Sequence, residues 1–137
     1  MRVLIIDGQG GKLGRQLCES IAQRFEAAQI VAVGTNTTAT AAMMKGGAKL
    51  CATGENAVIV NCRNADVIVG PIGIVIADSM LGEITPAMAL AVAQSDAAKI
   101  LIPANRCNNF VAGIAGVSVN DMLDDALKLL DNLASNA

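Results

Sequence analysis

Residues 2–14 read RVLIIDGQGGKLG, an apolar run that leads directly into a glycine-rich turn. A short aliphatic run bounded by glycine is typical of a strand buried in a parallel sheet. Over residues 11–28 the apolar residues then recur every four positions, at Leu13, Leu17, Ile21 and Phe25. That period predicts an amphipathic helix. Strand, glycine turn and helix in this order form the arrangement in which backbone N–H groups hold a phosphate.

The predicted phosphate-binding residues are consecutive: Gly8, Gln9, Gly10, Gly11, Lys12, Leu13 and Gly14. We expect Gly8 to adopt a positive φ directly after the strand. Gly10 and Gly11 should let a phosphate approach the backbone, and Gly14 should let the helix pack closely on the strand. The spacing departs from a strict Gly-x-Gly-x-x-Gly pattern, because Leu13 occupies its last position. The alternative is a tight turn without a ligand, since glycines also serve packing alone.

The composition indicates one small domain with an aliphatic core. The chain has 137 residues, 53% of them hydrophobic, and its only aromatic residues are Phe25 and Phe110. A core of Ile, Val, Leu, Met and Ala is typical of a parallel sheet, and residues 1–137 are expected to form a single domain. The mean hydropathy of +0.51 with 16% charged residues leaves few polar groups for the surface. We therefore expect a homo-oligomer in which subunits cover apolar area.

Several classes of protein are disfavoured by what the sequence lacks. A net charge of −2 without Tyr or Trp disfavours nucleic acid as a partner. No uncharged apolar stretch is long enough for a membrane span or a signal peptide, so we expect a cytoplasmic protein with no membrane partner. The four cysteines stand singly and there is no histidine, which predicts reduced thiols and no metal site. Without histidine, a Ser-His-Asp triad within one chain is excluded.

Apolar runs and helical patterns alternate along the whole chain. Strands are predicted at residues 3–7, 30–34, 49–52, 66–70 and 99–103, with a weaker sixth at 110–115. Further helices are predicted at residues 38–45, 54–63, 86–94 and 121–134, with Thr37 or Thr38, Thr53, Thr85 and Asn120 as their N-caps. Residues 74–77 fit a strand or the start of a helix ending at Gly82, and we favour the helix. The predicted fold is a single doubly wound, Rossmann-like α/β domain of three layers, with a mainly parallel sheet of five or six strands.

Ligands of such sheets bind outside the carboxyl ends of the strands. Polar or glycine-rich segments that follow predicted strands are therefore candidates: residues 8–13, Thr35 and Asn36, residues 53–55, Gly70 and Pro71 through Gly73, and Asn105 with Arg106. Residues 61–64 precede a strand, so we expect them on the opposite edge.

The end of the second predicted strand lacks the acidic residue that usually binds the ribose hydroxyls of a dinucleotide. Thr35 and Asn36 stand there instead. Their uncharged donors suit a 2′-phosphate better than a carboxylate would, so NADP, NAD, another nucleotide or a phosphorylated metabolite are all candidate ligands. The alternative is that a threonine there only caps the next helix.

Polar residues 105–109 follow the fifth predicted strand. Arg106 is suited to hold a carboxylate or a phosphate with two hydrogen bonds, next to Asn105. Cys107 is a candidate nucleophile, but no base accompanies it. Asp78 and Glu83, with Ser79 between them, offer a carboxylate for acid–base chemistry, although we favour a solvated or capping cluster that includes Asp78.

The glycine turn resembles the nucleotide-binding turns of the dihydrodipicolinate reductase and prephenate dehydrogenase families over about fifteen residues. In residues 5–15, 61–86 and 102–110 the chain also resembles a small uncharacterised family of bacterial Rossmann-like proteins. That resemblance covers nearly the whole length and implies the fold, but no activity.

Three functional hypotheses follow from the sequence. The first is a nucleotide-binding module that acts as a ligand sensor or as a subunit working with a partner. We favour it because no separate substrate domain follows the Rossmann-like unit. The second is a small NAD(P)-dependent oxidoreductase whose active site is completed at a subunit interface. The third is an oligomeric scaffold without a nucleotide. The lack of His and Tyr leaves only Lys, Asp, Glu and Cys for acid–base work and disfavours the second.

Overall fold

The structure is a computed structural model that describes residues 1–104 and 108–136. Strands and helices alternate along the chain, as the sequence predicts. The strands are β1 (Arg2–Asp7), β2 (Gln29–Gly34), β3 (Leu50–Thr53), β4 (Val67–Pro71) and β5 (Ala98–Ile102). The helices are α1 (Lys12–Arg24), α2 (Thr37–Lys45), α3 (Glu55–Cys62), α4 (Pro86–Gln94) and α5 (Val119–Ser135), with a 3-10 turn η1 (Ile72–Val75) after β4.

The five strands form one parallel sheet in the order β3-β2-β1-β4-β5. The chain thus builds outward from β1 to β3, then returns to the other side of β1 with β4. Val3 in β1 pairs with Ile30 on one side and with Val67 on the other. Where the strand order reverses, the connections leave in opposite directions and a crevice opens outside the carboxyl ends of the strands. In this sheet the reversal lies between β1 and β4.

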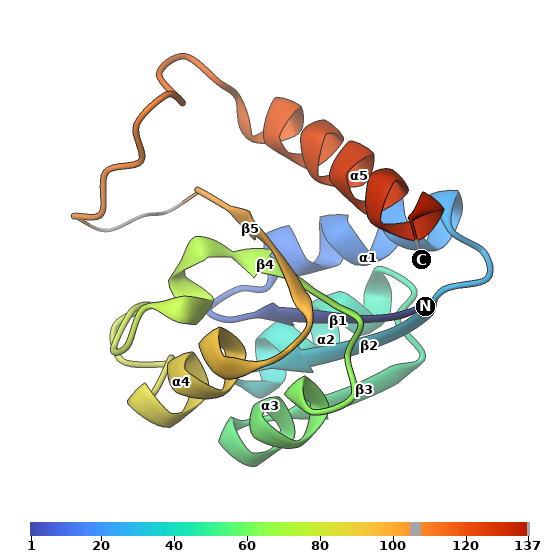
Figure 1. The fold of residues 1–137 in the computed structure, drawn as a ribbon. Coiled ribbons are helices and arrows are strands. Elements are labelled where there is room, and N and C mark those ends of the chain that lie inside the picture. The colour runs from blue at the N-terminus through green and yellow to red at the C-terminus, as the bar shows by residue number, and fades with distance from the viewer. Residues whose placement is uncertain (105–107, 137) are drawn as a thin grey trace.

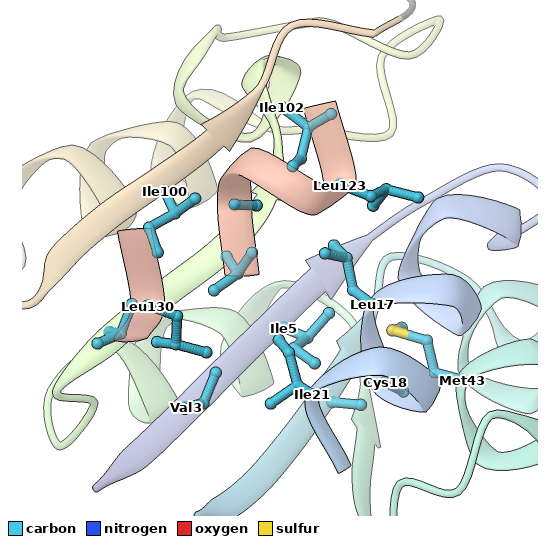
Figure 2. Packing of buried hydrophobic residues seen from close by; sticks show 14 of the residues in the cluster. Val3, Ile5, Leu17, Cys18, Ile21, Met43, Ile100, Ile102, Leu123 and Leu130 are labelled. Carbon is cyan, nitrogen blue, oxygen red and sulfur yellow. The ribbon is translucent and has the colours of Figure 1, made fainter. Parts of the chain in front are cut away.

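Helices cover both faces of the sheet, so the domain has three layers. Figure 1 shows α1 and α5 on one face and α3 and α4 on the other. Figure 2 shows Val3 and Ile5 of β1 packed against α1 and α5, where Leu17, Ile21 and Leu130 are fully buried. The alternate residues of β1 face the other way, into a second cluster built with α3 and α4. Burial of both faces explains why β1 reads as a continuous apolar run rather than an alternating one.

The predicted sixth strand at residues 110–115 is wrong, and the sheet has five strands. No helix or strand forms between residues 108 and 118. Phe110 is 90% exposed. Gly113 and Gly116 take left-handed backbone conformations, with φ of 89° and 77°. A left-handed residue interrupts the pleat of a strand, so the apolar character of this segment did not produce pairing.

The favoured helix over residues 74–82 is also wrong. After η1 the chain forms a tight loop in which Asp78, Met80, Leu81 and Gly82 all have φ between 55° and 90°. Left-handed residues end a helix rather than extend it. Gly82 therefore belongs to a loop that returns to α4, and this loop contacts the glycine turn after β1 through Glu83.

Three helix starts differ from the prediction, while a fourth is confirmed. Thr85 caps α4 by accepting a hydrogen bond from the Met88 N–H at 3.1 Å. The cap of α2 is Asn36 rather than a threonine, and the cap of α5 is Ser118 rather than Asn120. Gly54, not Thr53, precedes α3 and makes no side-chain cap. Among the described residues, no helix has the length and apolar character needed to cross a membrane.

Candidate functional site

A buried carboxylate organises the turn between β1 and α1. Asp7, the last residue of β1, accepts hydrogen bonds from the Gly8 N–H through Oδ1 at 2.8 Å and from the Gly14 N–H through Oδ2 at 2.7 Å. Its side chain thus spans the turn and satisfies a donor in the first turn of α1. This role of Asp7 was not predicted from the sequence. An aspartate between a buried strand and a glycine turn was the available signal.

The charge of Asp7 is costly to bury. Burial raises the pKa of Asp7 above its ordinary value of 3.8, and the nearby charge of Glu83 adds to this rise, while the hydrogen bonds from Gly14 and Gly8 oppose it. A carboxyl with a raised native pKa stabilises the fold most below its unfolded pKa, and this contribution is lost as the pH rises through the native pKa.

An Asp7→Asn variant tests this arrangement. At neutral pH we expect it to be less stable by about 1–3 kcal/mol, because one of the two N–H donors then faces an amide NH₂. The deficit should grow as the pH is lowered from about 7 to about 4, since only the wild-type protein gains a proton there. Urea unfolding at several pH values measures this. A deficit that shrinks on acidification would contradict the assignment. The control is Asp66→Asn, because Asp66 is an exposed carboxylate that also accepts a backbone hydrogen bond, at the opposite edge of the sheet.

Two glycines of the turn, Gly8 and Gly11, have different roles from those expected. Gly8 has no positive φ; the left-handed residues are Gln9 and Gly11, with φ of 51° and 74°. A Cβ on Gly8 would lie 2.7 Å from both the Met80 sulfur and the Thr35 hydroxyl oxygen. Gly8 is therefore required because the loop after η1 and the end of β2 both pack on it.

Gly11 and Gly14 serve packing, whereas Gly10 is open. A Cβ on Gly11 would lie 2.7 Å from the Ala39 Cα in α2, and one on Gly14 would lie 2.8 Å from the Asp7 Cβ. The expected close packing at Gly14 is thus confirmed, but Gly11 approaches a helix rather than a ligand. A Cβ on Gly10 would meet nothing within 4 Å. Only Gly10 leaves open space at the turn.

Three N–H groups at this turn have no acceptor within residues 1–104 and 108–136: those of Gly10, Lys12 and Leu13. The neighbouring N–H groups are used, because Gly11 donates to the Gly8 carbonyl at 3.0 Å and Arg15 donates to the Gly11 carbonyl at 2.9 Å. The residues with free N–H groups line a pocket of about 140 Å³ together with Pro71 and Met80. The pocket lies at the reversal of strand order, and the N-terminus of α1 supplies a positive dipole end there.

Glu83 lies at the end of β2, where the strand itself is not followed by an acidic residue. Its Oε1 accepts hydrogen bonds from the Gln9 N–H at 2.9 Å, the Thr35 hydroxyl at 2.6 Å and the Asn36 amide at 2.7 Å. The expectation that Thr35 and Asn36 offer free, uncharged donors to a 2′-phosphate is therefore wrong. The solvated or capping cluster expected around Asp78 does not extend to Glu83, because the loop carries Glu83 onto the glycine turn.

Residues 2–135 match the model of a family described as a domain of unknown function, DUF3842. The chain belongs to that family. No curated protein matches it. It is similar to the crystal structure of a dodecameric FMN-dependent UbiX-like decarboxylase from Escherichia coli O157:H7, with 13% sequence identity and a TM-score of 0.46, over 98% of this chain and 95% of the other.

Of the other predicted binding residues of this DUF3842 member, only some lie at the glycine turn. Pro71 lines the pocket at the turn, whereas Gly70 lets β4 approach β1, because a Cβ there would collide with the Ile6 carbonyl oxygen. The Thr53 hydroxyl pairs with that of Thr40 at 2.7 Å, away from the turn. The predicted binding residues Asn105 and Arg106, and the candidate nucleophile Cys107, lie outside the described residues.

A second, larger pocket adjoins the turn. It has a volume of about 520 Å³ and shares Lys12 and Leu13 with the first pocket. Its other walls come from α1, from the chain after β5 and from the start of α5, at Gln16, Pro103, Ala104, Val117, Ser118, Val119, Asn120 and Met122. A ligand held at the turn therefore has room to extend toward the N-terminus of α5.

The opposite edge of the sheet holds the segment expected there. The Asn61 side chain accepts a hydrogen bond from Arg2, at the start of β1, at 3.3 Å. A hollow of about 540 Å³ between α3 and α4 also lies at this end, where Cys62 and Arg63 meet Ser95 and Asp96. It is far from the carboxyl ends of the strands, where ligands of doubly wound sheets bind.

Proposed function

We propose that this protein binds a nucleotide whose phosphate rests on the β1–α1 turn. The observation that carries the proposal is the group of N–H donors at Gly10, Lys12 and Leu13, which have no acceptor among the described residues and line one pocket at the reversal of strand order. Backbone N–H groups at a helix N-terminus bind phosphate oxygens through hydrogen bonds and through the helix dipole. The open space at Gly10 leaves room for the anion.

The charge around the turn supports an anionic ligand. Lys12 is exposed and lines both pockets, and it forms no ion pair within the described part of the chain, where the salt bridges join Arg15 to Glu19 and Arg24 to Asp131. An ammonium group without a partner beside a helix N-terminus favours a phosphate further. The adjoining pocket of about 520 Å³ offers space for the base or another part of the nucleotide.

Binding is better supported than catalysis. Both carboxylates at the turn are engaged, Asp7 by two backbone N–H groups and Glu83 by three donors. Burial raises the pKa of Cys18 to about 12 and that of Cys62 to about 11, so neither thiol is a nucleophile at neutral pH. A hydride-transfer assay with NADH and NADPH tests the alternative of an oxidoreductase completed at a subunit interface.

Thermal melting against a panel of ligands tests the proposal. The panel contains NAD, NADP, their reduced forms, ADP, coenzyme A and FMN, with adenosine as the control that lacks a phosphate. A ligand at one hundred times its dissociation constant adds about 2.7 kcal/mol, which raises the Tm of a domain of this size by roughly 8 °C. At least one phosphate-bearing ligand should do so, and adenosine should not. If no member of the panel moves the Tm, or if adenosine acts as strongly as ADP, the proposal fails.

A further inference from the structure

The loop that follows η1 is compact and is held together by hydrogen bonds between its own residues. The Asp78 N–H donates to the Ile84 carbonyl at 2.7 Å, and the Ile84 N–H donates back to the Ser79 carbonyl at 3.2 Å. The Ser79 hydroxyl also donates to the Gly73 carbonyl at 2.5 Å. Ile84 is fully buried and anchors the end of the loop in the core. Since Glu83 directly precedes this anchor, its backbone has little freedom to move.

Among the residues that the structure describes, only neutral donors hold the Glu83 carboxylate. The peptide N–H of Gln9, the hydroxyl of Thr35 and the amide of Asn36 all donate to Oε1, and no Lys or Arg among the described residues pairs with it. Burial raises the pKa of Glu83, but these three hydrogen bonds outweigh burial and hold the pKa below its ordinary value of 4.5. Glu83 therefore carries a full negative charge at neutral pH, although no cation within residues 1–104 and 108–136 balances it.

The second oxygen of the carboxylate is available. All three hydrogen bonds go to Oε1, while Oε2 has no partner within residues 1–104 and 108–136 and is not buried. A carboxylate fixed through one oxygen can accept a hydrogen bond from a ligand hydroxyl through the other without rearranging. A phosphate at the same place would meet a like charge instead.

The position of Glu83 fits the sugar of a nucleotide. In doubly wound nucleotide-binding sheets, an acidic residue at the end of the second strand accepts hydrogen bonds from the ribose hydroxyls. Here that strand end is Thr35 and Asn36, and the acid reaches it from the β4–α4 loop. Gln9, which donates to Glu83, directly precedes Gly10, whose N–H has no acceptor in the described part of the chain. A sugar at Glu83 and a phosphate at Gly10 would thus be neighbours, as they are in a nucleotide.

We infer that Glu83 is the specificity-determining residue of this site, accepting a hydrogen bond from a free sugar hydroxyl and rejecting a ligand that carries a phosphate on that hydroxyl. This inference rests on the proposed nucleotide binding. It predicts that the protein prefers NAD to NADP, which differ only by the 2′-phosphate, by at least about tenfold in Kd.

The test compares Kd values for NAD and NADP in the wild-type chain and in Glu83→Gln. The glutamine Oε1 can still accept the three internal hydrogen bonds, so the ligand-free Tm should stay close to that of the wild type. Its NH₂ group replaces Oε2 and carries no charge, so NAD binding should weaken about tenfold and the preference for NAD should disappear. The control is Glu26→Gln, which removes the same charge from an exposed residue just before β2. This variant should leave both Kd values unchanged.

The remaining outcomes separate this inference from the proposed function. A wild-type chain that binds NADP as tightly as NAD, or a Glu83→Gln variant that keeps the preference, overturns the role of Glu83 while nucleotide binding stands. A variant that binds both ligands more tightly also overturns it, because Glu83 would then be a competitor for the site. If NAD does not bind, the role of Glu83 is likewise overturned. The proposed function itself fails only if no phosphate-bearing ligand of the melting panel binds.

Discussion

A Gly10→Asp variant should fold normally and lose its affinity for ADP by at least about 100-fold. The new side chain enters open space, because nothing lies within 4 Å of the Cβ position of Gly10 and its backbone is not left-handed. The added carboxylate then lies where the phosphate should bind. Two like charges about 4 Å apart near a protein surface repel by roughly 4 kcal/mol, which is more than a hundredfold in Kd. Calorimetric titration with ADP measures the effect.

The matched control for this variant is Asn64→Asp. Asn64 is exposed in the segment between α3 and β4, at the opposite edge of the sheet, so the substitution adds the same charge far from the turn. It should leave ADP affinity unchanged. A folded Gly10→Asp variant that binds ADP like the wild type would show that the phosphate lies elsewhere, and a variant that does not fold would contradict the open space assigned to Gly10.

A Gly11→Val variant should lower the free energy of unfolding by about 3 kcal/mol or more, with or without a ligand. Gly11 has a φ of 74°, and a Cβ there would lie 2.7 Å from the Ala39 Cα and 2.9 Å from the Ala39 carbonyl oxygen. The left-handed conformation costs a side chain about 1–2 kcal/mol, and overlap with a packed helix costs about 1–3 kcal/mol more. This is a large part of the 5–15 kcal/mol that stabilises a typical domain. Urea unfolding gives the value.

Gly10→Val is the control for Gly11→Val, because it places the same side chain one residue earlier in open space. It should change the free energy of unfolding by less than about 1 kcal/mol, as is usual for surface substitutions. Equal destabilisation by the two variants would contradict the contact between Gly11 and α2. The pair therefore separates the glycine that serves packing from the glycine that leaves room for an anion.

The fold was predictable because buried parallel strands have a simple signature. Each run that became a central strand, such as Val3 to Asp7, is apolar on both faces and ends at glycine or polar residues. The two wrong elements share one cause. Residues 74–82 and 110–115 are apolar enough for regular structure, but left-handed residues such as Leu81 and Gly113 break it. Leu81 is not glycine, and the sequence gives no local signal for its conformation.

The candidate site was predictable only where it is local in sequence. The strand, turn and helix around Gly10 are consecutive, and their pattern is visible within a few residues. Glu83 reaches the turn across more than seventy residues, as its hydrogen bond to Gln9 shows. Its position depends on the path of the loop after β4, which is the segment whose structure was predicted wrongly. An acid missing from the end of the second strand is therefore not evidence that the site lacks one.

The most direct test of phosphate binding at the turn follows the backbone amides during a titration with ADP by nuclear magnetic resonance. We predict that the amide signals of Gly10, Lys12 and Leu13 shift most and saturate together with one Kd, because their N–H groups have no acceptor within residues 1–104 and 108–136. ADP binding that leaves these signals in place, and moves those of the hollow between α3 and α4 instead, would contradict the account.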